Sequence, residues 1–294
     1  TRLQGDWSSD VCSSDLKNIS GAEFRRLPHK AVTLLGMSGA GKTTLAAKLP
    51  QQTWFHYSGD YRIGTRYLDE PILDNAKREA MKSPFLADLL RSDSIYLCHN
   101  ITINNLKPLS KFLGMIGDPA LGGLSVDEFK RRQALHRDAE IRSMLDVREF
   151  IAKANEIYGY PHFINDAGGS LCELDEPGVL EQLAEDTLIV YLKPSEDMLG
   201  QIIERSLADP KPMYYQNDFL DQALPQYLSE RGLSSAEEIT PNDLFRWIFP
   251  RLVDHRLPRY EKIAAEYGVV LPAEAMGKIR GETEFIGIIS EVLG

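Results

Sequence analysis

The chain has 294 residues, of which 43% are hydrophobic and 26% charged, and its net charge at pH 7 is -10. This composition is typical of a globular protein with a substantial core. The negative charge argues against nucleic acid as the main partner, because such binders usually carry a clustered basic surface. The sequence has no apolar run long enough for a membrane span and no signal-peptide pattern. We therefore expect a cytoplasmic protein without a membrane partner.

The first residues of the chain look foreign to the rest. Residues 6–16 read Asp-Trp-Ser-Ser-Asp-Val-Cys-Ser-Ser-Asp-Leu, which resembles the in-frame translation of a common sequencing-library adapter. This stretch is polar and has neither a helix nor a strand period. We expect residues 1–16 to be a non-native, dispensable tail and residues 17–294 to form a single domain.

Strand and helix patterns alternate through much of the chain. The predicted strands are Ala31–Leu35, Thr53–Tyr57, His162–Asn165, Thr187–Leu192 and Gly268–Leu271. The predicted helices cover 43–49, about 125–145, the residues after Ser195, those after Thr240, and 282–293. This alternation predicts an α/β fold with a doubly wound parallel sheet. Residues 68–158 are mostly helical in pattern and form a helical insertion, in which 95–103 could be strand or helix.

A glycine-rich loop follows the first predicted strand. Residues 36–43 read Gly-Met-Ser-Gly-Ala-Gly-Lys-Thr, the complete pattern G-x-x-x-x-G-K-[ST] of a phosphate-binding loop between a strand and a helix. Glycines let the backbone curl so that N–H groups point at phosphates, and the helix adds its positive end. We therefore expect a fold of the P-loop NTPase type that binds ATP. The residues expected to contact the nucleotide are Gly36, Ser38, Gly39, Ala40, Gly41, Lys42, Thr43 and Thr44.

Two positions of this pattern carry the chemistry of phosphoryl transfer. Lys42 can place a positive charge on the β- and γ-phosphates, so it is an expected catalytic residue. Thr43 can ligate Mg²⁺ through its hydroxyl group. Asp166 follows a predicted strand and can hold the same ion through water. Thr43 and Asp166 are therefore the expected metal residues.

Further polar residues and glycines follow other predicted strands. Asp60 follows the second predicted strand, which we expect one strand over from the glycine-rich loop. Ligands of doubly wound sheets bind at the carboxyl ends of the strands. Asp60 is therefore a candidate for acceptor binding or general-base catalysis, and the other interpretation is a turn aspartate that caps a loop. Gly168 and Gly169 either let substrate approach the backbone or only form a turn.

Several motifs resemble, in matching order, those of the shikimate-kinase group of small P-loop kinases. Residues 60–63 resemble the D-x-x-I motif of that group, and residues 136–140 are a loose match to its F-R-x-x-E. Residues 167–169 stand at its glycine triplet, and residues 256–264 are similar to its R-x-P-x-Y-x-x-x-A helix. For Arg137, an exposed position on a solvated helix face is the favoured alternative. The residues assigned to the acceptor are Asp60, Arg62, Arg137, Gly168, Gly169 and Lys211.

The resemblance also implies a lid over the phosphates. Arg205 and the pair Lys211-Pro212 stand where the group has a lid arginine and an R-P pair. We expect residues 205–215 to form this lid and Arg205 to stabilise charge on the transferring phosphoryl group. The alternative is an exposed arginine favoured by the helix dipole.

The chain also departs from this pattern. Ser58 replaces the first aspartate of D-x-D, the glycine triplet is reduced to two residues, and Lys211 replaces an arginine. The acceptor pocket is therefore expected to be built differently, and shikimate is not the expected substrate.

These observations predict an ATP- and Mg²⁺-dependent phosphotransferase with a small-molecule acceptor of unknown identity. The catalytic residues would be Lys42, Asp60 and Arg205. A second hypothesis is an ATPase that uses hydrolysis to drive a conformational change or a partner interaction. A third is a nucleotide-binding regulator with little turnover.

Overall fold

The protein is described from a computed structural model, in which residues 16–294 are the described part of the chain. The expected adapter-derived tail therefore lies, apart from Leu16, outside the described residues. Within them, no helix is long and apolar enough to cross a membrane.

The centre of the fold is a five-stranded sheet in which all strands run parallel. In spatial order the strands are β2, β3, β1, β4 and β5. Their bounds are β1 Lys30–Leu35, β2 Trp54–Ser58, β3 His162–Asp166, β4 Leu188–Lys193 and β5 Gly268–Pro272. All five predicted strands are thus confirmed, and the α/β class with a parallel sheet is correct.

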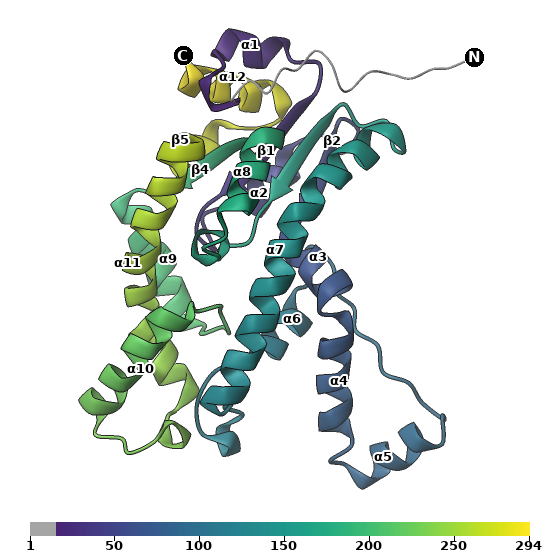
Figure 1. Ribbon diagram of the computed structural model, residues 1–294, viewed down its shortest axis with the longest axis vertical. Coiled ribbons are helices and arrows are strands. Elements are labelled where there is room, and N and C mark those ends of the chain that lie inside the picture. Colours follow the sequence, from purple (N-terminus) through teal and green to yellow (C-terminus); the bar gives the residue numbers. More distant parts are fainter. Residues whose placement is uncertain (1–15) are drawn as a thin grey trace.

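Helices connect the strands and extend the molecule beyond them. The α helices are α1 Gly21–Arg26, α2 Lys42–Lys48, α3 Gly59–Arg62, α4 Asp69–Ala80, α5 Pro84–Arg91, α6 Lys107–Leu113, α7 Val126–Glu156, α8 Pro177–Asp186, α9 Glu196–Ala208, α10 Asn217–Arg231, α11 Pro241–Tyr267 and α12 Glu282–Leu293. Figure 1 shows α7 and α11 extending past the sheet in the same direction, with α4 and α5 as an arm on one side.

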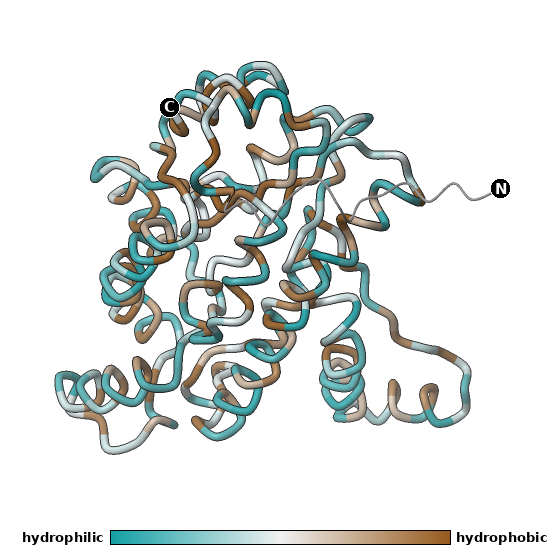
Figure 2. Tube along the Cα trace, turned by 45° about the horizontal axis from the view of Figure 1, so that its top comes forward, coloured by the Kyte–Doolittle hydropathy of each residue, from teal (hydrophilic) through white to brown (hydrophobic). Residues whose placement is uncertain are grey.

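The two faces of the sheet bury different side chains because residues of a strand alternate between faces. In β4, Val190 belongs to one core with residues of α1, α2 and α12, whereas Tyr191 belongs to a second core with α7, α8 and α11. Both side chains are fully buried. In Figure 2 the strands are mainly hydrophobic, whereas the helices mix both kinds of residue. A strand that is buried on both faces has apolar residues at successive positions, which explains the continuous apolar sequence of β4 from Leu188 to Leu192.

The strand order corrects one expectation about Asp60. Asp60 follows β2, and β3 lies between β2 and β1, so Asp60 is two strands away from the glycine-rich loop rather than one. The place of β3 in the sheet could not be predicted, because its short, polar pattern fits a central or an edge position equally well.

Two expectations for the helical insertion also need correction. Ser125 caps α7 by accepting a hydrogen bond from Glu128 N at 3.3 Å, but the helix continues to Glu156 instead of ending near Leu145. The carboxylate of Glu128 pairs with Arg131 and Arg132. Residues 95–103 form neither a strand nor a helix, and only an isolated bridge joins Thr102 to Asn105.

Candidate functional site

The glycine-rich loop, residues 36–43, connects β1 to α2 at the carboxyl end of the sheet. Gly39 and Gly41 have φ angles of 87° and 96°, in the left-handed region that glycine adopts without steric cost. Gly41 is also the N-cap residue of α2, so the loop runs directly into the helix. The first N–H groups of a helix have no intrahelical acceptor, which leaves those of α2 open to an anion.

Lys42 lies across this loop instead of extending into solvent. Its side chain is buried, and Nζ donates hydrogen bonds to the carbonyl oxygens of Gly36 at 2.6 Å and Met37 at 3.1 Å. Burial lowers the pKa of Lys42, whereas the negative charges of Asp166 and Asp60 oppose that shift. The Lys42 amine is therefore held at the loop by two backbone carbonyl oxygens, within the electrostatic influence of Asp166 and Asp60.

The two expected metal residues lie in contact. Asp166 ends β3 beside Leu34 of β1, and its Oδ2 accepts a hydrogen bond from Thr43 Oγ1 at 2.5 Å. His56 Nε2 lies 3.7 Å from the same oxygen. The parallel pairing of β1 with β3 thus brings together a hydroxyl group and a carboxylate that are far apart in sequence.

The turn after β3 packs directly on the glycine-rich loop. A Cβ atom on Gly169 would lie 3.0 Å from Ser38 N, and one on Gly168 would lie 2.4 Å from Glu140 Oε1. The carbonyl oxygen of Gly169 also accepts a hydrogen bond from the Tyr260 hydroxyl group. At both positions glycine is needed because other groups of the protein approach the backbone closely.

Asp60 lies in the first turn of α3, which Ser58 caps by accepting a hydrogen bond from Tyr61 N at 3.3 Å. Its side chain is half-buried and faces the cavity described below. Burial and then the charge of Asp166 raise the pKa of Asp60 to about 6, with Lys42 acting in the opposite direction. A carboxylate with a pKa near neutrality can exchange a proton with a substrate.

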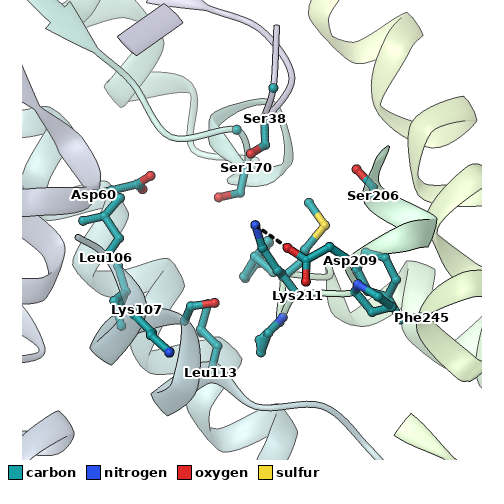
Figure 3. A pocket seen from close by; sticks show the side chains of 18 of the residues that line it. Ser38, Asp60, Leu106, Lys107, Leu113, Ser170, Ser206, Asp209, Lys211 and Phe245 are labelled. Atoms are coloured by element: carbon teal, nitrogen blue, oxygen red, sulfur yellow. Dashed lines mark ion pairs between the residues drawn. The ribbon is translucent and has the colours of Figure 1, made fainter. Parts of the chain in front are cut away.

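A cavity of about 1060 Å³ is lined by Ser38 and Gly39 of the glycine-rich loop, by Asp60 and by Gly169, whereas Lys42, Thr43 and Asp166 are not part of its lining. Figure 3 shows Ser38 and Ser170 on one side of it and Lys107 on the opposite side, with Asp60 reaching in between. The remaining wall comes from α9, the segment that follows it, and α11. Apolar side chains in the lining are Leu106, Leu109, Leu113, Ile202, Met213, Phe245 and Phe249.

The cavity carries positive charge although the whole chain is acidic. Five cationic side chains line it: Lys107, Lys111, Arg205, Lys211 and Arg256. Two of them are paired, because Arg256 contacts Glu173 at 2.6 Å and Lys211 contacts Asp209 at 2.9 Å. The other three make no ion pair with a carboxylate of residues 16–294. Lys107 and Lys111 are one helical turn apart on α6, so they share a face.

The segment expected to be a lid has two different halves. Arg205 is exposed in the last turn of α9, where its Nε donates to Gln201 O at 3.1 Å, and Lys211 is exposed as well. Tyr214 and Tyr215, in contrast, are buried. Tyr214 O accepts a hydrogen bond from Arg256, and Tyr215 N donates one to Gln133. The far end of the segment is thus anchored to α7 and α11.

Two residues assigned to the acceptor lie elsewhere. Arg62 pairs with Asp146 at 2.7 Å and stacks on Phe150. Arg137 donates hydrogen bonds to Leu174 O. Neither contributes to the cavity lining found among the described residues, so the structure brings Asp60, Gly169, Arg205 and Lys211 together but not these two arginines.

Sequence reasoning assigned no role to several residues of this region. The cavity lining includes Ser170 and His136, and Glu140 lies directly behind it. Glu140 and His136 occupy buried positions in α7. Two signals were available. Residues 136–140 are a loose match to F-R-x-x-E, with Glu140 at the glutamate of the motif. The i, i+4 spacing of Lys107 and Lys111 was the other signal, and it is common on solvated helices.

The oxygen atoms of Thr43 and Asp166 fit a magnesium ion, which takes hard oxygen ligands and usually needs only one or two protein groups beside substrate phosphates. Among residues 16–294, no group of three or more His, Cys, Asp or Glu side chains could hold a metal ion by itself. Comparisons with protein-family models, with curated proteins and with solved structures gave no match to this chain.

Proposed function

We propose that the protein is a P-loop phosphotransferase that moves the γ-phosphoryl group of ATP to a hydroxyl group of a small anionic acceptor. The observation that carries this proposal is the shared cavity, in which the glycine-rich loop and Asp60 face the same space. Its volume of about 1060 Å³ lies slightly above the range of roughly 300–1,000 Å³ for small-molecule sites. An ATPase needs room for only one water molecule beside the γ-phosphate, so a cavity of this size favours an organic acceptor.

The residues of the loop have separate tasks in this reaction. The N–H groups of the loop and α2 would bind the phosphates, and Lys42 would supply positive charge to the β- and γ-phosphates. Thr43 and Asp166 would hold Mg²⁺, which would neutralise part of the negative charge of the phosphates during transfer. Arg205 would approach the same phosphates when the segment after α9 closes.

The bond changes require one proton acceptor. The acceptor oxygen forms a bond to the γ-phosphorus, the bond from that phosphorus to the bridging oxygen breaks, and ADP leaves. The carboxylate of Asp60 takes the proton of the acceptor hydroxyl group and releases it to solvent after transfer. Asp60 is suited to this step because it faces the cavity and its pKa is about 6.

The charge of the cavity predicts which acceptors react. ATP turnover should be stimulated by hydroxy acids or phosphorylated alcohols and not by their uncharged counterparts, because Lys107 and Lys111 are free to bind an anion. The double variant Lys107→Gln, Lys111→Gln should raise the KM of the best acceptor by about tenfold or more, since a hydrogen bond to a charged group contributes about 1.5–3 kcal/mol. A coupled assay of ADP release against paired compounds measures both effects.

The matched control replaces two other lysines by glutamine: Lys77 in α4 and Lys82, which follows the C-terminal end of that helix. Both are exposed lysines that pair with acidic neighbours and lie outside the cavity lining, so the KM should stay unchanged. Equal stimulation by charged and uncharged acceptors would contradict the anionic acceptor. Steady hydrolysis that no acceptor stimulates would favour the ATPase hypothesis instead.

The segment between α9 and Tyr214 should close when nucleotide binds. Amide hydrogen exchange at residues 205–211 should slow on addition of a non-hydrolysable ATP analogue with Mg²⁺, because Arg205 then contacts phosphate. The amide of Tyr215 is an internal control, since it is already hydrogen-bonded to Gln133 at 3.0 Å. Equal exchange at 205–211 with and without the analogue would contradict a lid.

A further inference from the structure

Glu140 is a fully buried carboxyl group next to the cavity, and the reaction described above does not use it. It lies in the middle of α7 with 0% of its surface exposed. One oxygen, Oε2, accepts a hydrogen bond from Ser170 Oγ at 2.5 Å. The other oxygen, Oε1, has no hydrogen-bond partner within residues 16–294. Burying a carboxylate in this way is costly unless the group is neutral or paired.

Glu140 and Asp60 converge on the backbone of Gly168. A Cβ atom there would lie 2.4 Å from Glu140 Oε1 and 3.3 Å from Asp60 Oδ1. The unpartnered oxygen of Glu140 is therefore on the side of Asp60, close enough for a direct hydrogen bond or for one through a single water molecule. Because glycine at position 168 has no Cβ atom, both carboxyl oxygens have room beside its backbone.

Among residues 16–294, no lysine or arginine forms an ion pair with Glu140. The nearest basic groups are His136, with Nδ1 3.8 Å from Oε2, and Arg256. Burial and the charge of Arg256 lower the pKa of His136 to about 4, so it is neutral at pH 7. Arg256 is already paired with Glu173, whose carboxylate adds negative charge to the surroundings of Glu140.

These surroundings separate the titrations of the two carboxyl groups. Burial raises the pKa of Glu140 to about 8, with the charges of Asp60 and Glu173 acting in the same direction and Ser170 and Arg256 opposing it. Asp60, with a pKa of about 6, ionises first. At neutral pH the pair therefore consists of an ionised Asp60 and a neutral Glu140, the arrangement by which one site obtains a base and an acid from two carboxyl groups.

We propose that Glu140 is a positioning residue for phosphoryl transfer: its neutral carboxyl group donates a hydrogen bond toward Asp60 and holds the Asp60 carboxylate in the direction of the acceptor hydroxyl group. This inference rests on the proposed function. Glu140 stays protonated throughout the reaction, and the proton of the acceptor goes to Asp60. Ionisation of Glu140 removes the donor and puts a second negative charge beside the base, so it stops transfer.

The test compares the pH dependence of turnover in the wild type with that in Glu140→Gln and Glu140→Leu. The wild type should lose activity above pH 8, whereas Glu140→Gln, an amide that donates at every pH, should keep its activity to pH 9. At pH 7 the glutamine variant should retain about a third or more of wild-type kcat, and the leucine variant should lose about tenfold or more. A glutamine variant whose profile parallels that of the wild type would overturn the proposal.

The control variant is Glu149→Gln on the exposed side of the same helix, where the carboxylate pairs with Lys153. Its pH profile should match that of the wild type. Because Glu149 and Glu140 share α7, a general effect of removing a glutamate from this helix would appear in both variants.

A stability measurement reports on Glu140 without using activity. The folded pKa of about 8 lies above the ordinary value of 4.5, so the folded protein binds the extra proton and loses stability as pH rises between these values. The Tm of Glu140→Gln minus the Tm of the wild type should therefore increase by several degrees when the pH is raised from 5 to 8. A Tm difference that does not change with pH would show that Glu140 is not neutral at pH 7 and would overturn its positioning role, while leaving the proposed function intact. Absence of acceptor-dependent turnover in the wild type would overturn the proposed function and the positioning role with it.

Discussion

Replacing Lys42 by alanine should lower turnover by about 10²–10³-fold while the protein stays folded. Lys42 is the buried lysine of the glycine-rich loop and would supply positive charge to the phosphates, and the loss of one such electrostatic contact to the transferring group typically costs about 3–4 kcal/mol. The variant also loses two hydrogen bonds from Nζ to loop carbonyl oxygens. Initial rates of ADP formation at saturating ATP measure the effect, and circular dichroism checks the fold.

Lys48 provides the matched control because it belongs to the same helix. Its Nζ also donates to a backbone carbonyl, Met276 O at 2.8 Å, but it lies at the opposite end of α2 from the loop. Lys48→Ala should therefore change stability slightly and leave kcat within about twofold of wild type, as expected for a surface position away from the reacting groups. Similar rate losses in both variants would show that Lys42 acts only through the stability of α2.

Replacing Asp60 by asparagine should abolish transfer and spare nucleotide binding. The variant keeps the size of the side chain and removes the carboxylate that takes the acceptor proton, so acceptor-dependent turnover should fall by about 10²-fold or more. The affinity for ATP with Mg²⁺ should stay within about threefold, because the loop, Thr43 and Asp166 are unchanged. Calorimetric titration with a non-hydrolysable analogue separates binding from turnover.

The pH dependence gives a second readout for the same residue. A base must be ionised to act, so wild-type kcat/KM should fall as pH drops through the Asp60 pKa of about 6. Asp74→Asn on α4, an exposed carboxylate that pairs with Lys77, should change neither the rate nor this profile. If Asp60→Asn weakens binding of ATP with Mg²⁺ and leaves acceptor affinity alone, Asp60 belongs to the metal site and its assignment as a base is wrong.

The central sheet could be predicted because its strands have strong local patterns. Residues of β4 are buried on both faces and form an unbroken apolar run, and the glycine-rich loop has positional requirements that few other sequences meet. The predicted starts of two helices are also confirmed, since Ser195 caps α9 and α11 begins at Pro241. These features depend on neighbouring residues, which a sequence shows directly.

The parts that could not be predicted depend on contacts between distant residues. Arg62 was expected at the acceptor, but Asp146 and Phe150 of α7 draw its side chain away from the cavity. The hydrogen bond between Thr43 and Asp166 and the approach of Glu140 and Asp60 to Gly168 depend on the strand order, which the pattern of β3 does not reveal. The end of α7 was also placed too early, because no glycine or proline marks an end near Leu145.

The position of β3 between β1 and β2 has a consequence for how the chain folds. When β1 and β2 leave the ribosome, neither can pair with the other, because both need β3 as their neighbour. Between β2 and β3 lies the whole helical region from α3 to α7, so pairing must wait for a long loop to close, which slows folding. During synthesis the unpaired strand edges are open to wrong partners. We therefore expect fragments that end before β3 to aggregate rather than to fold into a smaller nucleotide-binding unit.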